Sequence, residues 1–502
     1  MFTNLIQMIR QVISKVFPFR NIETVESVET PLSSEMITAM ELWFNMYTGK
    51  SPWLADTNIK SLNLPVMICS EMARQVTLDL KWNITGGKTQ DGDDAQNPRS
   101  TYLKEEFEKL MHALRTKLEQ GCAAGGMTIR PYHKSDGHIY FDWTMAWNLY
   151  PVAFDDEGNL RDVIFRDTIQ EGKVTYTRLE RHCVQDDGTI RVSQRAFKST
   201  LRDNIGTEIP LKSVPQWKDL PPDTVVRDTE GQLFGWYKVA LANNIAVDDP
   251  LGVSVFSRAV DLIKQADYQF SNLCWEYEGG QLAIDVDPQV LVPKATGKTG
   301  PDGRPVMEMP KLNDRLFRGV DLGKDESYNV FNPSFRDVSL RAGLNDILIR
   351  IEDLCGISRG TLSDANTEAR TATELKIMQQ RTYATVADNQ AALERCLRDV
   401  IRTMNVYCDL YGLAPAGDYD VSFEWDDSII TDSTQQLGER LQLTSLGVSS
   451  KAELRMWYYG ETEAQARAAI QKIVDETVGI EAALAPPMPD EPIPGNPKGA
   501  DK

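Results

Sequence analysis

The chain has 502 residues, of which 73 are acidic and 54 are basic, so its formal net charge is 54 − 73 = −19. Hydrophobic residues make up 41% and charged residues 25%, a globular balance that excludes a disordered chain. Because phosphate binding needs clustered Lys and Arg, this charge argues against a protein that grips nucleic acid, though not against one that DNA merely passes. At about 150 residues per domain, the length suggests roughly three domain-sized units.

The reactive residue types predict neither a cofactor nor a metal site. The seven cysteines are an odd number without C-x-x-C spacing, which indicates free thiols in a reducing compartment. The four histidines form no H-E-x-x-H motif and no zinc-type cluster with cysteine. No apolar run approaches the roughly 18 residues that span a bilayer, so no membrane partner is predicted.

The first third of the chain is predicted to be helical and then rich in strands. The amphipathic segment Met1–Phe17 suits a helix that docks on its own protein or a neighbour better than a membrane-surface helix. Helices are predicted over 34–46 and over 105–118. Between them, the run Leu62–Cys69 leads into another predicted helix near Leu80. Short alternating segments separated by turn signals then predict an antiparallel β region: Met127–Tyr132, His138–Asp142, Val163–Asp167, Val174–Leu179 and Thr189–Val192.

The middle of the chain predicts two helices around an insert, followed by a loop and a very long helix. Ser254–Glu278 has apolar residues at helical spacing and would be a rod of roughly 38 Å. Gln281–Pro333 is rich in Pro and Gly, and Asp337–Cys355 is helical again. After the loop Gly356–Arg370, the capping box of Thr371 and Glu374 opens a helix that can run to Tyr411.

The last part is predicted to contain one strand and several short helices. Asp420–Trp425 alternates like a strand. Ser450 and Thr462 are helix N-caps, Gly460 is a helix stop, and the last helix is predicted to end near Thr477. From Pro486 the chain is proline-rich and is predicted to be disordered.

One segment imitates a nucleotide-binding loop. Ala295–Thr299 reads Ala-Thr-Gly-Lys-Thr, but the phosphate-binding fingerprint needs a glycine where Val292 stands, and Pro293 offers no amide. The segment leads into Gly300–Gly303 rather than a helix. A surface hairpin is therefore predicted, and no enzyme activity.

The order of these elements resembles a portal protein of tailed bacteriophages, of the kind found in siphoviruses of Gram-positive bacteria. The resemblance covers about residues 35–478 and depends mainly on the order helix, insert, helix, loop, long helix from Ser254 to Tyr411. Further segments carry it: Trp43–Tyr47 with Pro52 and Trp53, Leu62–Pro65, Ser70–Arg74, Tyr150–Asp155, Arg178–His182, Gly356–Gly360, Thr371–Glu374 and Phe423–Ser428.

The resemblance implies an α+β fold divided into the parts of a portal subunit. These parts would be an N-terminal arm (1–34), a wing (35–253), stem helix 1 (254–279), a clip (280–336), stem helix 2 (337–355), a tunnel loop (356–370), a spine helix with a returning wing strand (371–432), a crown (433–478) and a disordered tail (479–502).

The resemblance also implies a function and partners. About twelve copies would form a ring at one capsid vertex, through which double-stranded DNA passes without sequence specificity during packaging and ejection. Other partners would be the large terminase, head-completion or adaptor proteins, and the major capsid and scaffolding proteins. The protein would belong to the virion, and to the host cytoplasm during assembly.

Two sets of side chains are predicted to carry this function. Tunnel-loop residues would face the DNA: Ser358, Arg359, Thr361, Ser363, Asp364, Asn366, Glu368 and Arg370. Clip residues would form a docking surface: Lys298, Arg304, Lys311, Arg315, Arg318 and Lys324.

Several alternatives remain open at this point. The loop could be a passive connector, and the clip an ordinary solvated insert. The whole chain could be another virion head or neck protein without a channel, or an enzyme acting on nucleic acid. The enzyme would need a nucleotide or metal site that the sequence does not offer.

Overall fold

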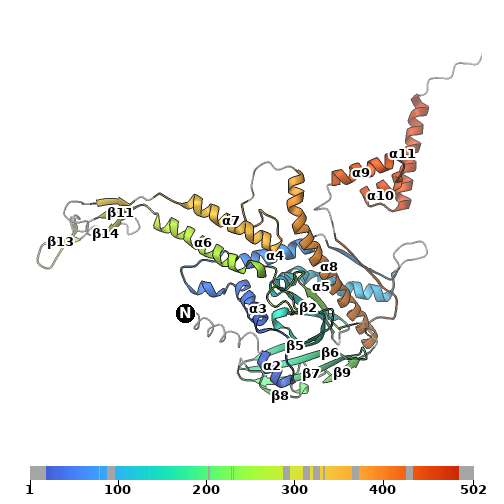
Figure 1. Cartoon of the computed structure of the whole chain (residues 1–502), viewed down its shortest axis with the longest axis horizontal. Coiled ribbons are helices and arrows are strands. Elements are labelled where there is room, and N and C mark those ends of the chain that lie inside the picture. Colours follow the sequence, from blue (N-terminus) through green and yellow to red (C-terminus); the bar gives the residue numbers. More distant parts are fainter. Residues whose placement is uncertain are drawn as a thin grey trace, which may run out of the picture. The chain divides into compact units, whose positions relative to one another are not determined.

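The computed structural model describes residues 19–78, 80–87, 96–134, 136–201, 204–227, 229, 231–286, 294–308, 317–319, 328–331, 334–364, 372–425 and 433–484. The chain divides into two compact units, Met1–Asp426 and Asp427–Lys502. Helices and mostly antiparallel sheets are both present (Figure 1), which agrees with the predicted α+β class. The predictions for residues 1–18 and 485–502 lie outside the described residues.

Helices open the described chain: α2 (Phe19–Glu26), α3 (Ser34–Tyr47), the 3-10 helix η1 (Pro52–Ala55), α4 (Leu64–Thr77) and α5 (Pro98–Ala124). The Ser33 hydroxyl caps α3 by accepting from the Met36 amide at 3.1 Å, so this helix begins where the sequence predicts. The helix α5 is 27 residues long and begins earlier than predicted. Its capping box pairs Asn97 with Ser100 instead of Glu or Gln, so the usual sequence signature is missing.

A close crossing of two backbones follows α5. Gly125 ends the helix with φ of 84°, and a Cβ there would lie 2.4 Å from the Gly252 carbonyl oxygen. Only glycine tolerates both the left-handed conformation and this approach. The crossing fixes the residues that precede the next long helix against the end of α5.

The predicted β region consists of two antiparallel sheets. The first has the order β10-β2-β3, with β10 (Gly235–Lys238), β2 (Gly126–His133) and β3 (Ile139–Met145). The second contains β4 (Tyr150–Phe154), β5 (Leu160–Glu171), β6 (Val174–Val184), β7 (Ile190–Ser199), β8 (Thr207–Ile209) and β9 (Asp223–Val226). Its order is β4-β5-β6-β7-β8, with β9 on β7, which confirms the predicted antiparallel arrangement.

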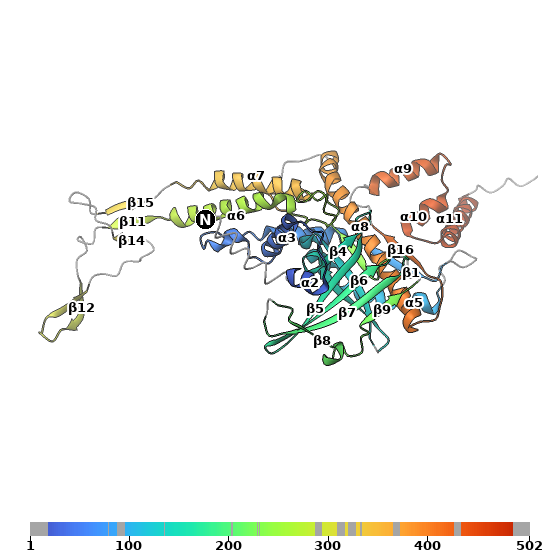
Figure 2. The ribbon, with the colours of Figure 1, turned by 60° about the horizontal axis from the view of Figure 1, so that its bottom comes forward.

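Two helices flank a strand-rich insert. The helices are α6 (Val260–Gly279) and α7 (Asp337–Cys355), and Figures 1 and 2 show them side by side. The described strands of the insert are β11 (Ala283–Val286), β12 (Lys294–Thr299), β13 (Pro305–Glu308), β14 (Phe317–Gly319) and β15 (Tyr328–Phe331). The bounds of α7 agree with the prediction.

The prediction that the helix α6 begins at Ser254 was wrong. Ser254–Phe256 is buried but not helical, and Val255 donates its amide to the Cys122 carbonyl at 3.0 Å. A short 3-10 helix, Ser257–Ala259, leads into α6. The apolar residues at helical spacing thus include some that are buried by a tertiary contact with α5.

The longest helix that the structure describes, α8 (Ala372–Tyr411), has 40 residues and confirms the predicted very long helix. Its buried stripe includes Leu393, Leu397, Val400 and Met404, and it packs on β2, β10, α4 and α5. The following strand β16 (Asp420–Glu424) pairs with β1 (Lys81–Thr85), so the predicted returning strand closes a two-stranded sheet.

The second unit contains α9 (Ser433–Ser445), α10 (Lys451–Tyr459) and α11 (Glu463–Leu484). Ser450 and Glu453 form a capping box, and Gly460 ends α10 with φ of 66°, as predicted. The last helix runs past the predicted end near Thr477 and through Gly479 to Leu484, because helix-forming residues follow that glycine and the first proline is Pro486.

Candidate functional site

The pair α6–α7 is fastened at the end that carries the insert. The Arg336 guanidinium lies 2.7 Å from the Glu276 carboxylate, and the Arg336 amide donates to the same carboxylate at 3.0 Å. The Arg341 guanidinium donates to the Tyr277 hydroxyl at 2.6 Å, and this hydroxyl donates to Asp337 at 3.3 Å. These contacts join the first turn of α7 to the last turn of α6, so the two helices form one rod.

Large apolar side chains remain exposed on this rod. Trp275 is 70% exposed, Val338 is 77% exposed, and Tyr268 is 42% exposed. In the insert, Tyr328 and Val330 are at least half exposed. Several large exposed apolar side chains on one element pair are typical of surfaces that another molecule covers.

A buried carboxylate holds α6 to the residues between α3 and α4. Asp267 is only 1% exposed. It accepts hydrogen bonds from the Trp53 indole and from the Leu62 amide, both at 2.8 Å. Trp53 and Leu62 belong to the segments that carry the resemblance, but Asp267 has no local signal, because its partners lie more than 200 residues away in the chain.

A second buried carboxylate orders the first half of the loop after α7. Glu352 is 0% exposed and accepts from the Leu362 amide at 2.6 Å, the Ser363 amide at 2.9 Å and the Ser363 hydroxyl at 2.7 Å. Gly356 ends α7 with φ of 69° and turns the chain back toward it. The loop is therefore fixed to α7 as far as Ser363. An acid in the apolar stripe directly before a Gly/Ser loop was the signal that could have identified Glu352.

The predicted loop residues divide into those held by the protein and those outside the described residues. The Ser358 hydroxyl donates to Thr382 at 3.1 Å, and Arg359 forms a two-point ion pair with Asp353, with the shorter contact at 2.7 Å. Ser363 is 8% exposed, so within one chain its side chain faces Glu352 rather than solvent.

Two further predicted loop residues, Thr361 and Asp364, also make hydrogen bonds. The Thr361 hydroxyl donates to the Ser358 carbonyl at 2.7 Å, and the Asp364 amide donates to the Asn345 side chain at 2.8 Å. The Asp364 side chain is exposed. The predictions for Asn366, Glu368 and Arg370 lie outside the described residues.

The predicted docking residues of the insert are placed only in part. Lys298 lies on β12 and Arg304 in the turn before β13, both exposed. Arg318 lies on β14, the edge strand that pairs in parallel with β11. Lys311, Arg315 and Lys324 lie outside the described residues.

The segment that imitates a nucleotide-binding loop is a hairpin, as predicted. Ala295–Thr299 belongs to β12, which pairs antiparallel with β13. The Gly300 amide donates to the Arg304 carbonyl at 2.8 Å across the turn. Among the described residues, no group of three His, Cys, Asp or Glu side chains could hold a metal ion.

Comparison with protein families defines the class. A family model described as a phage portal protein, SPP1 Gp6-like, matches residues 84–478. The chain therefore belongs to this family of phage portal proteins, which confirms the resemblance. A search of curated proteins found no match. The family is structural rather than enzymatic, and it implies ring assembly with other phage head proteins and a place in the virion capsid. Over the described part of the chain, no helix is long and apolar enough to cross a membrane.

Proposed function

We propose that this protein forms a closed ring of about twelve copies at one capsid vertex and is the conduit for DNA packaging and ejection. The exposed apolar surface of the α6–α7 rod, in a chain that belongs to the portal family, is the observation that carries the proposal. Trp275 and Val338 lie near the insert, on α6 and α7 respectively, and neighbouring copies would cover them in a ring.

The proposal assigns the parts of the subunit. The wing would be residues 35–253, α6 and α7 would be the stem helices, and 280–336 would be the clip. The tunnel loop would be 356–370, α8 and β16 would complete the wing, and 433–478 would be the crown. The order of the observed elements supports this assignment.

The experiment compares ring formation by the full chain and by Trp275→Ser. Because Trp275 is exposed in the single chain, its loss should change the stability of one subunit by less than about 0.5 kcal/mol. If the indole is buried in the ring, subunit association should weaken by about tenfold or more. Light scattering over a range of protein concentrations measures the association, and electron micrographs show the rings.

Val247→Ser is the matched control. Val247 is 84% exposed and lies in the connection between β10 and α6, outside the rod. This variant should assemble like the unchanged chain. An unchanged chain that stays monomeric at high concentration, or Trp275→Ser rings as stable as the unchanged ones, would contradict the proposed ring interface. Assemblies without a central hole would favour another head or neck component.

The clip is the proposed docking surface for the large terminase and later for head-completion proteins. Exposed Lys298 and Arg304 on its β12–β13 hairpin support this assignment. Arg304→Glu should weaken terminase capture on immobilised rings by about tenfold while ring formation is unchanged. The same change at Lys212, an exposed wing lysine, is the control. Equal terminase capture by both variants would remove Arg304 from the docking surface.

A further inference from the structure

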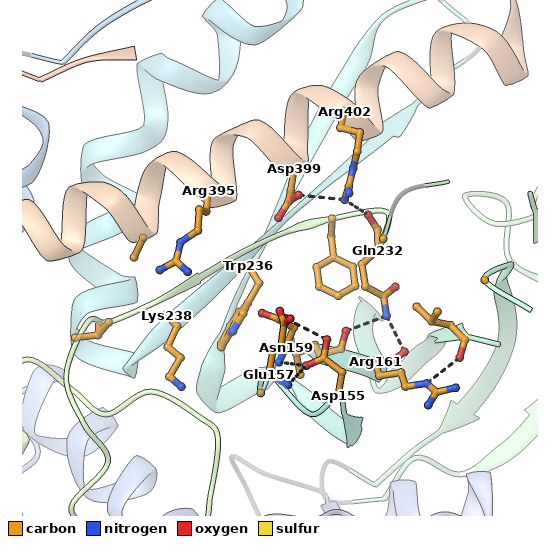
Figure 3. Close-up of a pocket in the computed structure, with 18 of the residues that line it drawn as sticks. Asp155, Glu157, Asn159, Arg161, Gln232, Trp236, Lys238, Arg395, Asp399 and Arg402 are labelled. Atoms are coloured by element: carbon orange, nitrogen blue, oxygen red, sulfur yellow. Dashed lines mark hydrogen bonds and ion pairs between the residues drawn. The ribbon is translucent and has the colours of Figure 1, made fainter. Parts of the chain in front are cut away.

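A cavity in the first unit has its charges matched within the chain. Its volume is about 940 Å³, and it is bounded by the turns that follow β4 and β6, by β10 and by α8 (Figure 3). Arg402 pairs with Asp399 at 3.2 Å, and Arg161 pairs with Asp186. Because four acids and four bases line the cavity, it favours neither an anion nor a cation. The second unit, in contrast, has apolar side chains that the chain leaves uncovered.

The second unit has almost no apolar core of its own. Its helices α9, α10 and α11 are 13, 9 and 22 residues long, and α10 packs on the other two (Figure 1). Among the residues of this unit whose side chains the structure describes, only Ala466 is buried. A unit of about 50 residues is marginal even with a well-formed core, so this one should gain stability from apolar surface outside it.

Large apolar side chains of this unit are exposed instead, each by between 43% and 72%. They lie on α9, in the turn after it, on α10 and on α11: Leu441, Leu443, Leu446, Val448, Tyr458, Tyr459, Ile473 and Val474. At roughly 150–250 Å² for a fully exposed large side chain, together they present about 800 Å². This area is close to the roughly 800 Å² that each partner contributes to a stable protein interface.

Two leucines of α9 face in nearly opposite directions. Leu441 and Leu443 are two residues apart, so at about 100° per residue they project about 200° apart around the helix. Both are exposed. One flat contact covers one side of a helix and cannot bury both leucines. A copy that lies between two neighbours can bury both, because each neighbour covers one side.

The charge of the second unit suits contact between copies. Residues 433–484 contain seven acids and five bases, a net charge of −2, whereas the whole chain carries −19. Like copies therefore repel one another less here than over the rest of the chain. The Arg440 guanidinium lies 4.7 Å from the Trp457 ring centre, and that of Arg455 lies 4.8 Å from the Tyr459 ring centre. Arg, Trp and Tyr are the residue types that dominate protein interfaces.

We propose that the second units of neighbouring copies pack on one another and form a continuous apolar belt around the ring. The Leu441 side and the Leu443 side of α9 would each meet a different neighbour. This inference rests on the proposed ring. It adds a contact between copies that is separate from Trp275 and Val338 on the α6–α7 rod.

The test compares ring formation by Leu441→Ser and by Leu443→Ser, each in the full chain. Because both leucines are exposed in the single chain, each variant subunit should fold like the unchanged one. Both variants should weaken subunit association by about tenfold, measured by light scattering over a range of protein concentrations. Gln442→Ser is the matched control, because Gln442 is exposed on the same helix and is polar. It should leave association unchanged.

Hydrogen exchange of the α9 and α10 amides is the second measurement. These amides should exchange more slowly in rings than in subunits dissociated by dilution. Weaker association of only one leucine variant would mean a one-sided contact and would overturn the belt. Normal rings without slower exchange would also overturn it, because another head protein would then cover this surface, and the ring proposal would stand. Exchange that is equally slow at all concentrations would place the cover within one chain. Slower exchange in assemblies without a central hole would keep the contact between second units and reject the ring.

Discussion

At the scale of single residues, one buried arginine closes the end of the longest helix. Arg99 is 2% exposed, and it donates to acceptors at and beyond the C-terminal turns of α8: the carbonyls of Asn405, Ala414 and Pro415 and the side chains of Asn405 and Asp409. Arg99→Met keeps the apolar stem but removes all of these charge-assisted hydrogen bonds. We expect the free energy of unfolding to fall by about 3 kcal/mol, measured by denaturant unfolding.

The control for this prediction is an exposed ion pair. Arg74 pairs with Glu71 one helical turn away, with half of the Arg74 side chain exposed. Arg74→Met should change the free energy of unfolding by less than about 0.5 kcal/mol. Equal effects of the two substitutions would show that Arg99 contributes no more than a surface arginine.

A second residue-scale prediction concerns pH. Glu41 on α3 is 2% exposed, neither carboxyl oxygen has a hydrogen-bond partner, and burial raises its pKa to about 7. The folded state therefore holds a proton that the unfolded chain releases, so stability falls as pH rises from about 4.5 to about 7. Glu41→Gln should remove this loss. The free energy of unfolding of Glu41→Gln minus that of the unchanged chain should be roughly 2–3 kcal/mol larger at pH 8 than at pH 5.

Unfolding of both chains at pH 5 and pH 8 measures this difference. Glu35→Gln, on the exposed side of the same helix, is the control and should give the same difference at both pH values. If the difference in free energy of unfolding for Glu41→Gln is also the same at pH 5 and pH 8, then Glu41 does not take up a proton on folding.

At the scale of elements, local signals in the sequence were reliable and non-local ones were not. The bounds of α7 and the caps of α10 were predicted because apolar periodicity, Ser450 and Gly460 act within a few residues. The predicted start of α6 was wrong because the residues before it are buried and bound through the Val255 amide to Cys122 at the end of α5, a contact that sequence spacing does not reveal. The anchoring of the loop after α7 could not be predicted, because Glu352 lies eight to eleven residues from the groups that it fixes.

Because its first half is anchored to Glu352, the second half of the loop can be removed separately. We propose that the loop copies narrow the channel and help to retain DNA. Deleting residues 365–368 leaves Ser363 and its bonds to Glu352 in place, so the rod and the ring should form normally. Packaged or retained DNA should fall several-fold, because fewer loop groups could meet the duplex. Nuclease-protected DNA per capsid measures the effect.

Glu352→Ala is the complementary variant. It removes the acceptor for the Leu362 and Ser363 amides and should raise their hydrogen exchange. Asp353→Ala, which removes the ion pair with Arg359, should leave those amides protected. For the deletion of residues 365–368, unchanged DNA retention would contradict the proposed role and would mean that the loop only connects α7 to α8.

At the scale of the whole molecule, the charge of the proposed stem suits a conduit. The helices α6 and α7 together contain eight acids and three bases. With 20 residues, α6 is roughly 30 Å long, rather than the 38 Å expected from the sequence, and it would face about 18 phosphates of a passing duplex. An acidic wall releases no counterions from DNA, so the duplex can slide.

The same charge leads to the last prediction, on the assembly of the ring. Copies that each carry −19 repel one another, while the proposed contacts at Trp275 and Val338 are apolar. The screening length falls from about 10 Å at 0.1 M salt to about 3 Å at 1 M, so added salt weakens the repulsion and leaves apolar burial intact. Ring formation should therefore be stronger at 1 M than at 0.1 M sodium chloride, and light scattering at fixed protein concentration measures it. Rings that dissociate as salt rises would mean that ion pairs, not the apolar surface of the rod, hold the copies together.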